Sequence, residues 1–80
     1  MEKRLAARIR AARHRAGFTQ QELADETGVS RVHIARVESG RGRMSIGNLR
    51  AIARVLGVGI DHLVGTFEED DKPALTAASV

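Results

Sequence analysis

Hydrophobic residues recur along this chain at the three- and four-residue spacing of helices, and glycines separate one such stretch from the next. Leu5, Ile9, Ala12 and Ala16 form the first stripe, and Gly17 is the residue expected to end that helix. The sequence has no alternating run of β-branched residues, the pattern that predicts a half-buried strand. The hydrophobic pattern therefore predicts an all-α protein.

Capping residues predict the bounds of the next two helices. Thr19 followed three positions later by Glu22 is a capping box, and Gly28 is expected to end the helix that this box starts. Ser30 is the expected N-cap of a third helix, which Gly40 stops. These signals predict two short helices joined by a turn of a few residues.

Two further helices complete the predicted fold. Ser45 is expected to start the fourth helix, and residues 58–64 are expected to form the fifth. The predicted apolar face of the fourth helix consists of Ile46, Leu49, Ile52, Ala53 and Leu56. We therefore expect one compact five-helix domain over residues 1–67, followed by an acidic, flexible tail over residues 68–80.

Composition agrees with a small helical domain. A chain of 80 residues has room for one hydrophobic core, and with only Phe18 and Phe67 aromatic that core must be aliphatic. The chain has no cysteine and no apolar run approaching the ~18 residues that span a bilayer. We therefore expect a cytoplasmic protein without a membrane segment.

The sequence offers no arrangement for catalysis. His14, His33 and His62 are too scattered for a local metal motif. The serines have no acid–base partner nearby in the sequence, and no glycine-rich loop follows a strand. We therefore expect no enzymatic activity, no cofactor and no metal.

Charge is distributed unevenly along the chain. Residues 1–67 carry 12 Lys and Arg against 6 Asp and Glu, a net charge of +6, whereas residues 68–80 carry 1 against 4, a net charge of −3. A basic body indicates a polyanionic partner such as nucleic acid. Eleven of the 13 cations are arginine, which suits phosphate and guanine, although a GC-rich genome explains that bias equally well.

Residues 20–39 carry the most informative pattern. Their two predicted helices are joined by a connection of the length used in helix-turn-helix units. Ala24 is small where the helices must cross closely, and Gly28 supplies the positive φ of a tight turn. Ile34 and Val37, three residues apart, are expected to fix the second helix to the domain and to turn its opposite face outward.

At these residues the chain resembles the helix-turn-helix family of phage repressors and xenobiotic-response-element-type bacterial regulators. The matching residues are Thr19-Gln20-Gln21-Glu22-Leu23-Ala24, Gly28-Val29-Ser30-Arg31 and Ile34-Ala35-Arg36-Val37-Glu38-Ser39-Gly40, within a likeness that spans about residues 5–65. The resemblance implies a compact five-helix domain of the lambda-repressor-like DNA-binding type. Arg43-Met44-Ser45-Ile46, with Met44 where many relatives have Pro, resembles the same stretch of restriction–modification controller proteins.

The resemblance assigns one set of residues to the DNA backbone, although each is otherwise an ordinary surface residue. Gln20, at the start of the first motif helix, matches a phosphate contact. Backbone contacts are also implied for Ser39, Arg41 and Arg43. His33 is either a phosphate contact or a solvated surface histidine.

A second set of residues matches the positions that meet base edges in this family. These residues are Ser30, Arg31, Val32, Ala35 and Arg36. Arg31 suits a bidentate contact to guanine, Val32 suits a thymine methyl group, and Arg36 suits a second guanine or a phosphate. Exposed residues without a DNA role are the alternative for each.

Glu38 needs a partner in this setting. A carboxylate at the end of a helix is unfavourable to the helix dipole, and an exposed one next to DNA would repel phosphate. The resemblance pairs Glu38 with Arg13, as the matching positions are paired in the family. The implied role of this ion pair is structural, namely to orient the DNA-reading helix.

These features favour a sequence-specific transcriptional regulator, a repressor that binds a palindromic operator on double-stranded DNA as a homodimer. A monomer meets only about 4–6 base pairs, too few for selective occupancy of a genome. The fourth and fifth helices are the expected interface. Candidate contacts are Leu63, Val64 and Phe67, with packing inside the monomer an equal alternative for Leu63.

Two other functions are compatible with the sequence. One is an antitoxin-type DNA-binding protein, in which the tail with Leu75 and Val80 binds a partner protein. The other is a protein–protein adaptor that has lost DNA binding. Arg31 and Arg36 on the expected outer face argue against the adaptor.

Overall fold

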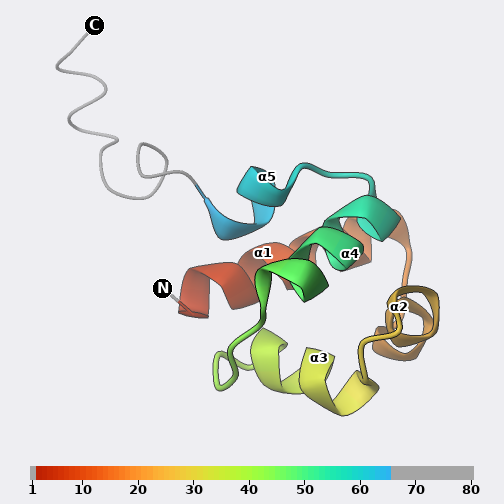
Figure 1. The fold of residues 1–80 in the computed structure, drawn as a ribbon, viewed down its shortest axis with the longest axis horizontal. Coiled ribbons are helices and arrows are strands. Elements are labelled where there is room, and N and C mark those ends of the chain that lie inside the picture. The colour runs from red at the N-terminus through yellow and green to blue at the C-terminus, as the bar shows by residue number, and fades with distance from the viewer. Residues whose placement is uncertain (1, 66–80) are drawn as a thin grey trace, which may run out of the picture.

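The computed structural model describes residues 2–65, which form five α-helices and no β-strand (Figure 1). The helices are α1 (Glu2–Ala16), α2 (Gln20–Thr27), α3 (Arg31–Glu38), α4 (Ile46–Leu56) and α5 (Ile60–Val64). The predicted all-α fold is therefore confirmed within these residues. The predicted tail over residues 68–80 and Phe67 lie outside the described residues.

The start of α5 differs from the prediction because of the way in which α4 ends. Gly57 has a positive φ of 74°, and the N–H of Val58 donates to the carbonyl oxygen of Ala53 at 2.9 Å. This pattern is the Schellman ending of a helix. The N–H of Val58 thus serves the C-terminal cap of α4, Gly59 is the N-cap of α5, and α5 begins at Ile60.

The five helices surround a single core. α1 contacts α3, α4 and α5, whereas α2 contacts α3 and α4. In Figure 1, α2 and α3 lie on the lower side of the molecule, with α5 on the opposite side. The outer surface of α3 therefore faces away from the rest of the domain.

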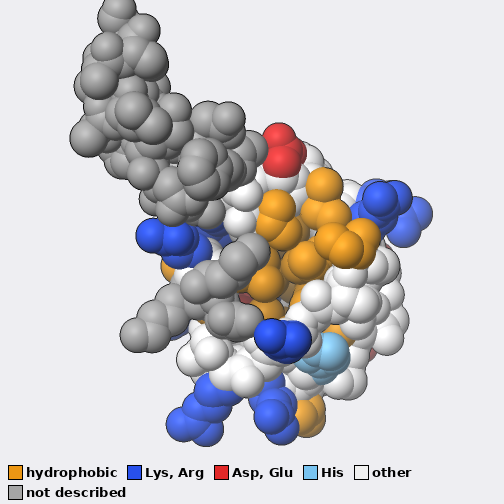
Figure 2. Space-filling view, turned by 60° about the vertical axis from the view of Figure 1, so that its left-hand side comes forward, with side chains coloured by type: hydrophobic (Ala, Val, Ile, Leu, Met, Phe, Trp, Pro, Cys, Tyr) orange, Lys and Arg blue, Asp and Glu red, His pale blue; other side chains and the backbone are white. Residues whose placement is uncertain are grey.

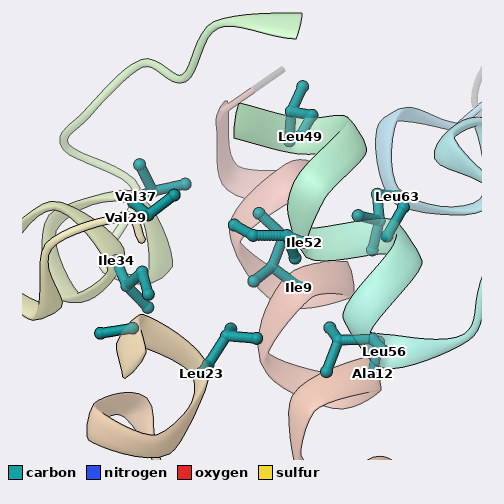
Figure 3. Close-up of a cluster of buried hydrophobic side chains, with 12 residues drawn as sticks. Ile9, Ala12, Leu23, Val29, Ile34, Val37, Leu49, Ile52, Leu56 and Leu63 are labelled. Atoms are coloured by element: carbon teal, nitrogen blue, oxygen red, sulfur yellow. The ribbon is translucent and has the colours of Figure 1, made fainter. Parts of the chain in front are cut away.

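The core is built from aliphatic side chains of all five helices (Figure 3). Its largest fully buried members are Ile9, Leu23, Ile34, Val37, Ile52 and Leu63. Complete burial of one such side chain stabilises a fold by about 1.5–3 kcal/mol. Phe18 is only half-buried and packs against the edge of this cluster. The core therefore holds α3 through Ile34 and Val37, as the sequence predicts.

Helical spacing predicted two residues to be buried that the structure shows to be exposed, Ile46 and Ala16. Ile46 is 56% exposed, although its spacing continues the stripe of α4 that is otherwise buried. Ala16 is exposed at the end of α1, whereas Ala6, outside the predicted stripe, is buried. Spacing identifies a helix face, but burial also requires a neighbouring element opposite each position on that face.

Candidate nucleic-acid interface

The turn between α2 and α3 is held by its own hydrogen bonds. Gly28 has a φ of +79°, and its N–H donates to the carbonyl oxygen of Ala24 at 2.9 Å. The Thr27 hydroxyl donates to the carbonyl oxygen of Leu23 at 2.7 Å and accepts from the N–H of Val29 at 3.1 Å. The left-handed conformation favours glycine at position 28. These contacts fix the direction in which α3 starts.

The N-termini of both helices are capped. The Thr19 hydroxyl accepts from the N–H of Glu22 at 3.0 Å, and the Glu22 carboxylate accepts from the N–H of Thr19 at 2.9 Å. The predicted capping box is therefore present. At the start of α3, the Ser30 hydroxyl accepts from the N–H of His33 at 3.0 Å. The hydroxyl hydrogen of Ser30 can still be donated outward.

The two faces of α3 have opposite chemistry. Ile34 and Val37 are 0% and 1% exposed on the inner face. On the outer face Arg31 and Arg36 are exposed, and Val32 is 61% exposed although it is apolar. Ala35 is half-buried between the two faces. The helix is thus fixed to the core on one side and presents cationic and apolar groups on the other.

Arg13 and Glu38 form a buried, bidentate ion pair between α1 and α3. The Nε and Nη2 atoms of Arg13 donate to the two Glu38 carboxylate oxygens at 2.7 and 2.9 Å. The side chains of Arg13 and Glu38 are 10% and 4% exposed. Arg13 Nη1 also donates to the carbonyl oxygen of Phe18 at 2.8 Å, which ties the pair to the chain before α2. Charge-assisted, bidentate bonds of this kind fix orientation as well as distance.

Gln20 extends this network to the start of α2. Its side-chain Nε2 donates to a carboxylate oxygen of Glu38 at 3.1 Å. The half-buried amide is therefore oriented from inside, while its second hydrogen and its carbonyl oxygen can serve an outside partner. On the α1 side, Arg13 Nη2 lies 3.2 Å from His14 Nε2, which must accept because a guanidinium only donates.

One arginine beside this network was not predicted as a site residue. Arg10 is exposed and lines a shallow groove with Gln20, Ala35 and Ser39, all of which were predicted to contact DNA. Arg10 precedes Arg13 by three positions, so the two share a side of α1. That spacing is the signal from which Arg10 could have been found.

The segment after α3 carries the remaining predicted backbone contacts. The Ser39 hydroxyl donates to the carbonyl oxygen of Arg36 at 2.7 Å, and the side chains of Arg41 and Arg43 are exposed. His33 is half-buried, with its Nε2 2.8 Å from the carbonyl oxygen of Arg43. His33 is therefore bound to this segment, which neither sequence interpretation of His33 anticipated.

The structure changes the set of candidate dimer contacts. Leu63 is 0% exposed and belongs to the core, so it has no surface to offer a partner, and the alternative of packing inside the monomer holds. Val64 is half-buried, and Ile46 is an exposed apolar residue that was not expected there. Figure 2 shows hydrophobic side chains gathered on one face of the molecule, with Lys and Arg side chains around them.

Within residues 2–65, no three His, Asp, Glu or Cys side chains lie close enough to hold a metal ion. None of the helices in the same residues has both the length and the hydropathy needed to cross a membrane.

Comparison with known proteins identifies the class of this fold. A helix-turn-helix family model matches residues 9–63, from the middle of α1 into α5. The match includes both motif helices, the turn and the helices that support them. The chain therefore belongs to the helix-turn-helix family of phage repressors and related regulators, with its lambda-repressor-like all-α fold.

Individual relatives agree with this assignment. The chain is 33% identical over 72 residues to the cryptic phage CTXphi transcriptional repressor RstR of Vibrio cholerae, covering 90% of this chain and 64% of that protein. It is 36% identical over 58 residues to the immunity repressor protein of Bacillus phage phi105, covering 72% and 40% respectively. An uncharacterised helix-turn-helix-type transcriptional regulator of Methanothermobacter thermautotrophicus is 39% identical over 66 residues, covering 82% and 93%. The chain thus spans about two fifths to two thirds of the two phage repressors.

Proposed function

We propose that this chain is a repressor that binds a specific sequence of double-stranded DNA. The observation that carries the proposal is the position of α3, which is buried through Ile34 and Val37 and exposes Arg31 on its outer face. A helix presented in this way fits the major groove of B-DNA, with its first residues closest to the bases. The names of the two phage relatives, a transcriptional repressor and an immunity repressor, support a role in repression.

The proposed base readers lie on the outer face of α3. Arg31 forms a bidentate contact to the O6 and N7 atoms of a guanine, a contact worth about 1–3 kcal/mol of discrimination between bases. Val32 meets a thymine methyl group, which accounts for an apolar side chain that is 61% exposed. Arg36 reaches a second guanine or a phosphate. Ser30 and Ala35 line the surface against the base edges.

The proposed phosphate contacts surround this helix. Gln20 approaches one DNA strand from the start of α2, with its amide oriented by Glu38. Arg10, beside Gln20 in the same groove, adds a charged contact to that strand. The other backbone contacts are Ser39, Arg41 and Arg43, at and beyond the end of α3. Their role is to set the register of the protein on the duplex.

Selection of bound sequences from random duplexes tests this function. The full chain should enrich a recurring motif, and Arg31→Ala should lose the preference at one base pair of each half-site. Arg54→Gln is the control. Arg54 is also an exposed arginine, but it lies on α4, which packs against α1, α2 and α5 and carries none of the proposed DNA contacts. If no motif is enriched even at low salt, the proposed function is wrong.

We further propose that the active form is a homodimer on a palindromic operator. Two copies place their α3 helices about 34 Å apart on one face of the duplex. The exposed Ile46 on α4 and the half-buried Val64 on α5 support an apolar interface formed by these two helices. The predicted contact Phe67 lies outside the described residues. Leu63 is left out because it is buried.

Ile46→Asp tests the dimer with little expected damage to the monomer. Position 46 is the first residue of α4, where an acidic side chain is favourable to the helix dipole. Sedimentation at micromolar concentration should show a dimer for the unmodified chain and a monomer for the variant, with the same helical circular dichroism. A species of 8.7 kDa for the unmodified chain would contradict the dimer.

A further inference from the structure

The segment that follows α3, residues 41–43, is held against that helix at each of its three positions. The first anchor is the helix ending itself. Gly40 has a φ of +80°, and its N–H donates to the carbonyl oxygen of Val37 at 3.0 Å. The N–H of Arg41 donates to the carbonyl oxygen of Arg36 at 3.0 Å. This pair of bonds is a Schellman ending. The backbone of Arg41 is thus fixed by the helix before it.

The second anchor is the close approach of Gly42 to the side of α3. A Cβ atom at position 42 would lie 3.3 Å from Cγ2 of Val37 and 3.4 Å from Cβ of Arg36. The first distance is slightly shorter than ordinary carbon–carbon contact, and the second lies at its lower limit. A side chain at position 42 would therefore require the segment and the helix to move apart by a few tenths of an ångström.

The third anchor is the His33 side chain. Its Nε2 lies 2.8 Å from the carbonyl oxygen of Arg43, and because a carbonyl oxygen only accepts, Nε2 carries the hydrogen. The backbone of His33 is itself fixed, since its N–H donates to the Ser30 cap at 3.0 Å. A residue in the first turn of α3 therefore holds the third residue of the following segment.

We propose that His33 is a positioning residue, which holds the backbone of Arg43, and with it the end of the segment 41–43, at a fixed place relative to the base-reading face of α3. This inference rests on the proposed function, because it assigns the two arginines to the DNA backbone. A segment that is ordered before binding loses less conformational entropy on the DNA. His33 thus acts through the segment and makes no phosphate contact of its own.

Two substitutions separate the hydrogen bond from the bulk of the side chain. His33→Gln keeps a donor at about the reach of the imidazole Nε2, whereas His33→Leu keeps apolar volume and removes the donor. Affinity for the selected operator should fall about tenfold in His33→Leu and stay within about twofold of the unmodified chain in His33→Gln. An equal loss in both variants would overturn the proposal.

Combination with Arg43→Ala tests whether His33 acts through the segment. When the anchor is lost, the backbone of Arg43 is held less firmly, so Arg43→Ala should weaken binding less in the His33→Leu background than in the unmodified chain. Independent contacts of His33 and Arg43 with separate phosphates would instead give losses that multiply. Multiplicative losses would contradict a positioning role.

Measurements without DNA distinguish failure of this inference from failure of the proposed function. Nitrogen chemical shifts of the imidazole should report the tautomer with hydrogen on Nε2. The Arg41 amide should exchange faster in His33→Leu, and Gly42→Ala, which pushes the segment from the other side, should do the same. If operator selection succeeds but His33→Leu leaves this exchange unchanged, the inference fails and the proposed function stands. If selection fails while exchange responds, the anchor stands and its assignment to DNA binding is overturned.

Discussion

The inner and outer faces of α3 differ in almost every physical respect, although they share eight residues of one helix. The inner face is aliphatic and packed into the core through Ile34 and Val37. The outer face exposes Arg31, Val32 and Arg36. Side chains on the inner face determine where the helix lies, whereas those on the outer face are free to determine what it binds. Stability and specificity should therefore respond to different substitutions in the same helix.

Glu38 lies between the two faces, and its loss should have the largest effect. Glu38→Ala leaves the guanidinium of Arg13 buried without its partner, which costs about 3–5 kcal/mol. It also removes the acceptor that orients Gln20. We expect a substantial fall in Tm by thermal denaturation and weaker DNA binding. Glu26→Ala, at an exposed position on α2, is the control, and an unchanged Tm in Glu38→Ala would contradict the role of the pair.

Ile34 and Val32 form a matched pair for the inner and outer faces. Both are β-branched and aliphatic, but Ile34 is 0% exposed and Val32 is 61% exposed. Ile34→Ala should lower the free energy of unfolding by about 2–5 kcal/mol, because it leaves a cavity in the core. Val32→Ala should change it by no more than about 0.5 kcal/mol. Denaturant titration of both variants measures the difference. If both variants lost a similar free energy of unfolding, the two faces would not differ in their contribution to stability.

Arg31→Ala should change specificity and leave stability alone. Loss of a bidentate guanine contact should reduce discrimination at one base pair per half-site by about 1–3 kcal/mol. The Tm should remain within error of that of the unmodified chain, because Arg31 is exposed. Competition between duplexes that differ at single positions measures the effect. Equal weakening on all duplexes would place Arg31 on the DNA backbone instead.

Arg10→Gln and Arg43→Ala should have the smallest effects on specificity. Each removes one proposed phosphate contact, so the slope of log affinity against log salt should fall by about one, and affinity should weaken alike for all sequences. Arg54→Gln should leave the slope as it is. A slope that is unchanged in Arg10→Gln would remove α1 from the proposed interface.

Local signals explain why the bounds of α2 and α3 could be predicted from the sequence. The capping box at Thr19, the cap at Ser30 and the positive φ of Gly28 each depend on a few adjacent residues. The inward direction of Ile34 and Val37 followed from their spacing alone. The position of the candidate site on the chain is thus encoded within about twenty consecutive residues.

The features that could not be predicted depend on residues far apart in the sequence. Ile46 has helical spacing, but no element within residues 2–65 covers it, and Leu63 is buried because α5 packs on α1 and α4. The bonds from Gln20 to Glu38 and from His33 to Arg43 join separate segments, and neither has a pattern that marks it. Such contacts depend on tertiary packing, which periodicity does not describe.

The buried Arg13 side chain makes the motif dependent on a helix outside it. Arg13 belongs to α1, yet it bonds the carboxylate of Glu38, 25 positions later, and the carbonyl oxygen of Phe18. A peptide limited to residues 20–39 would contain the sequences of both motif helices but would lack this cation, leaving the Glu38 carboxylate without its partner. The helix-turn-helix unit of this chain is accordingly not autonomous, and grafting it into another scaffold requires α1 to be carried with it.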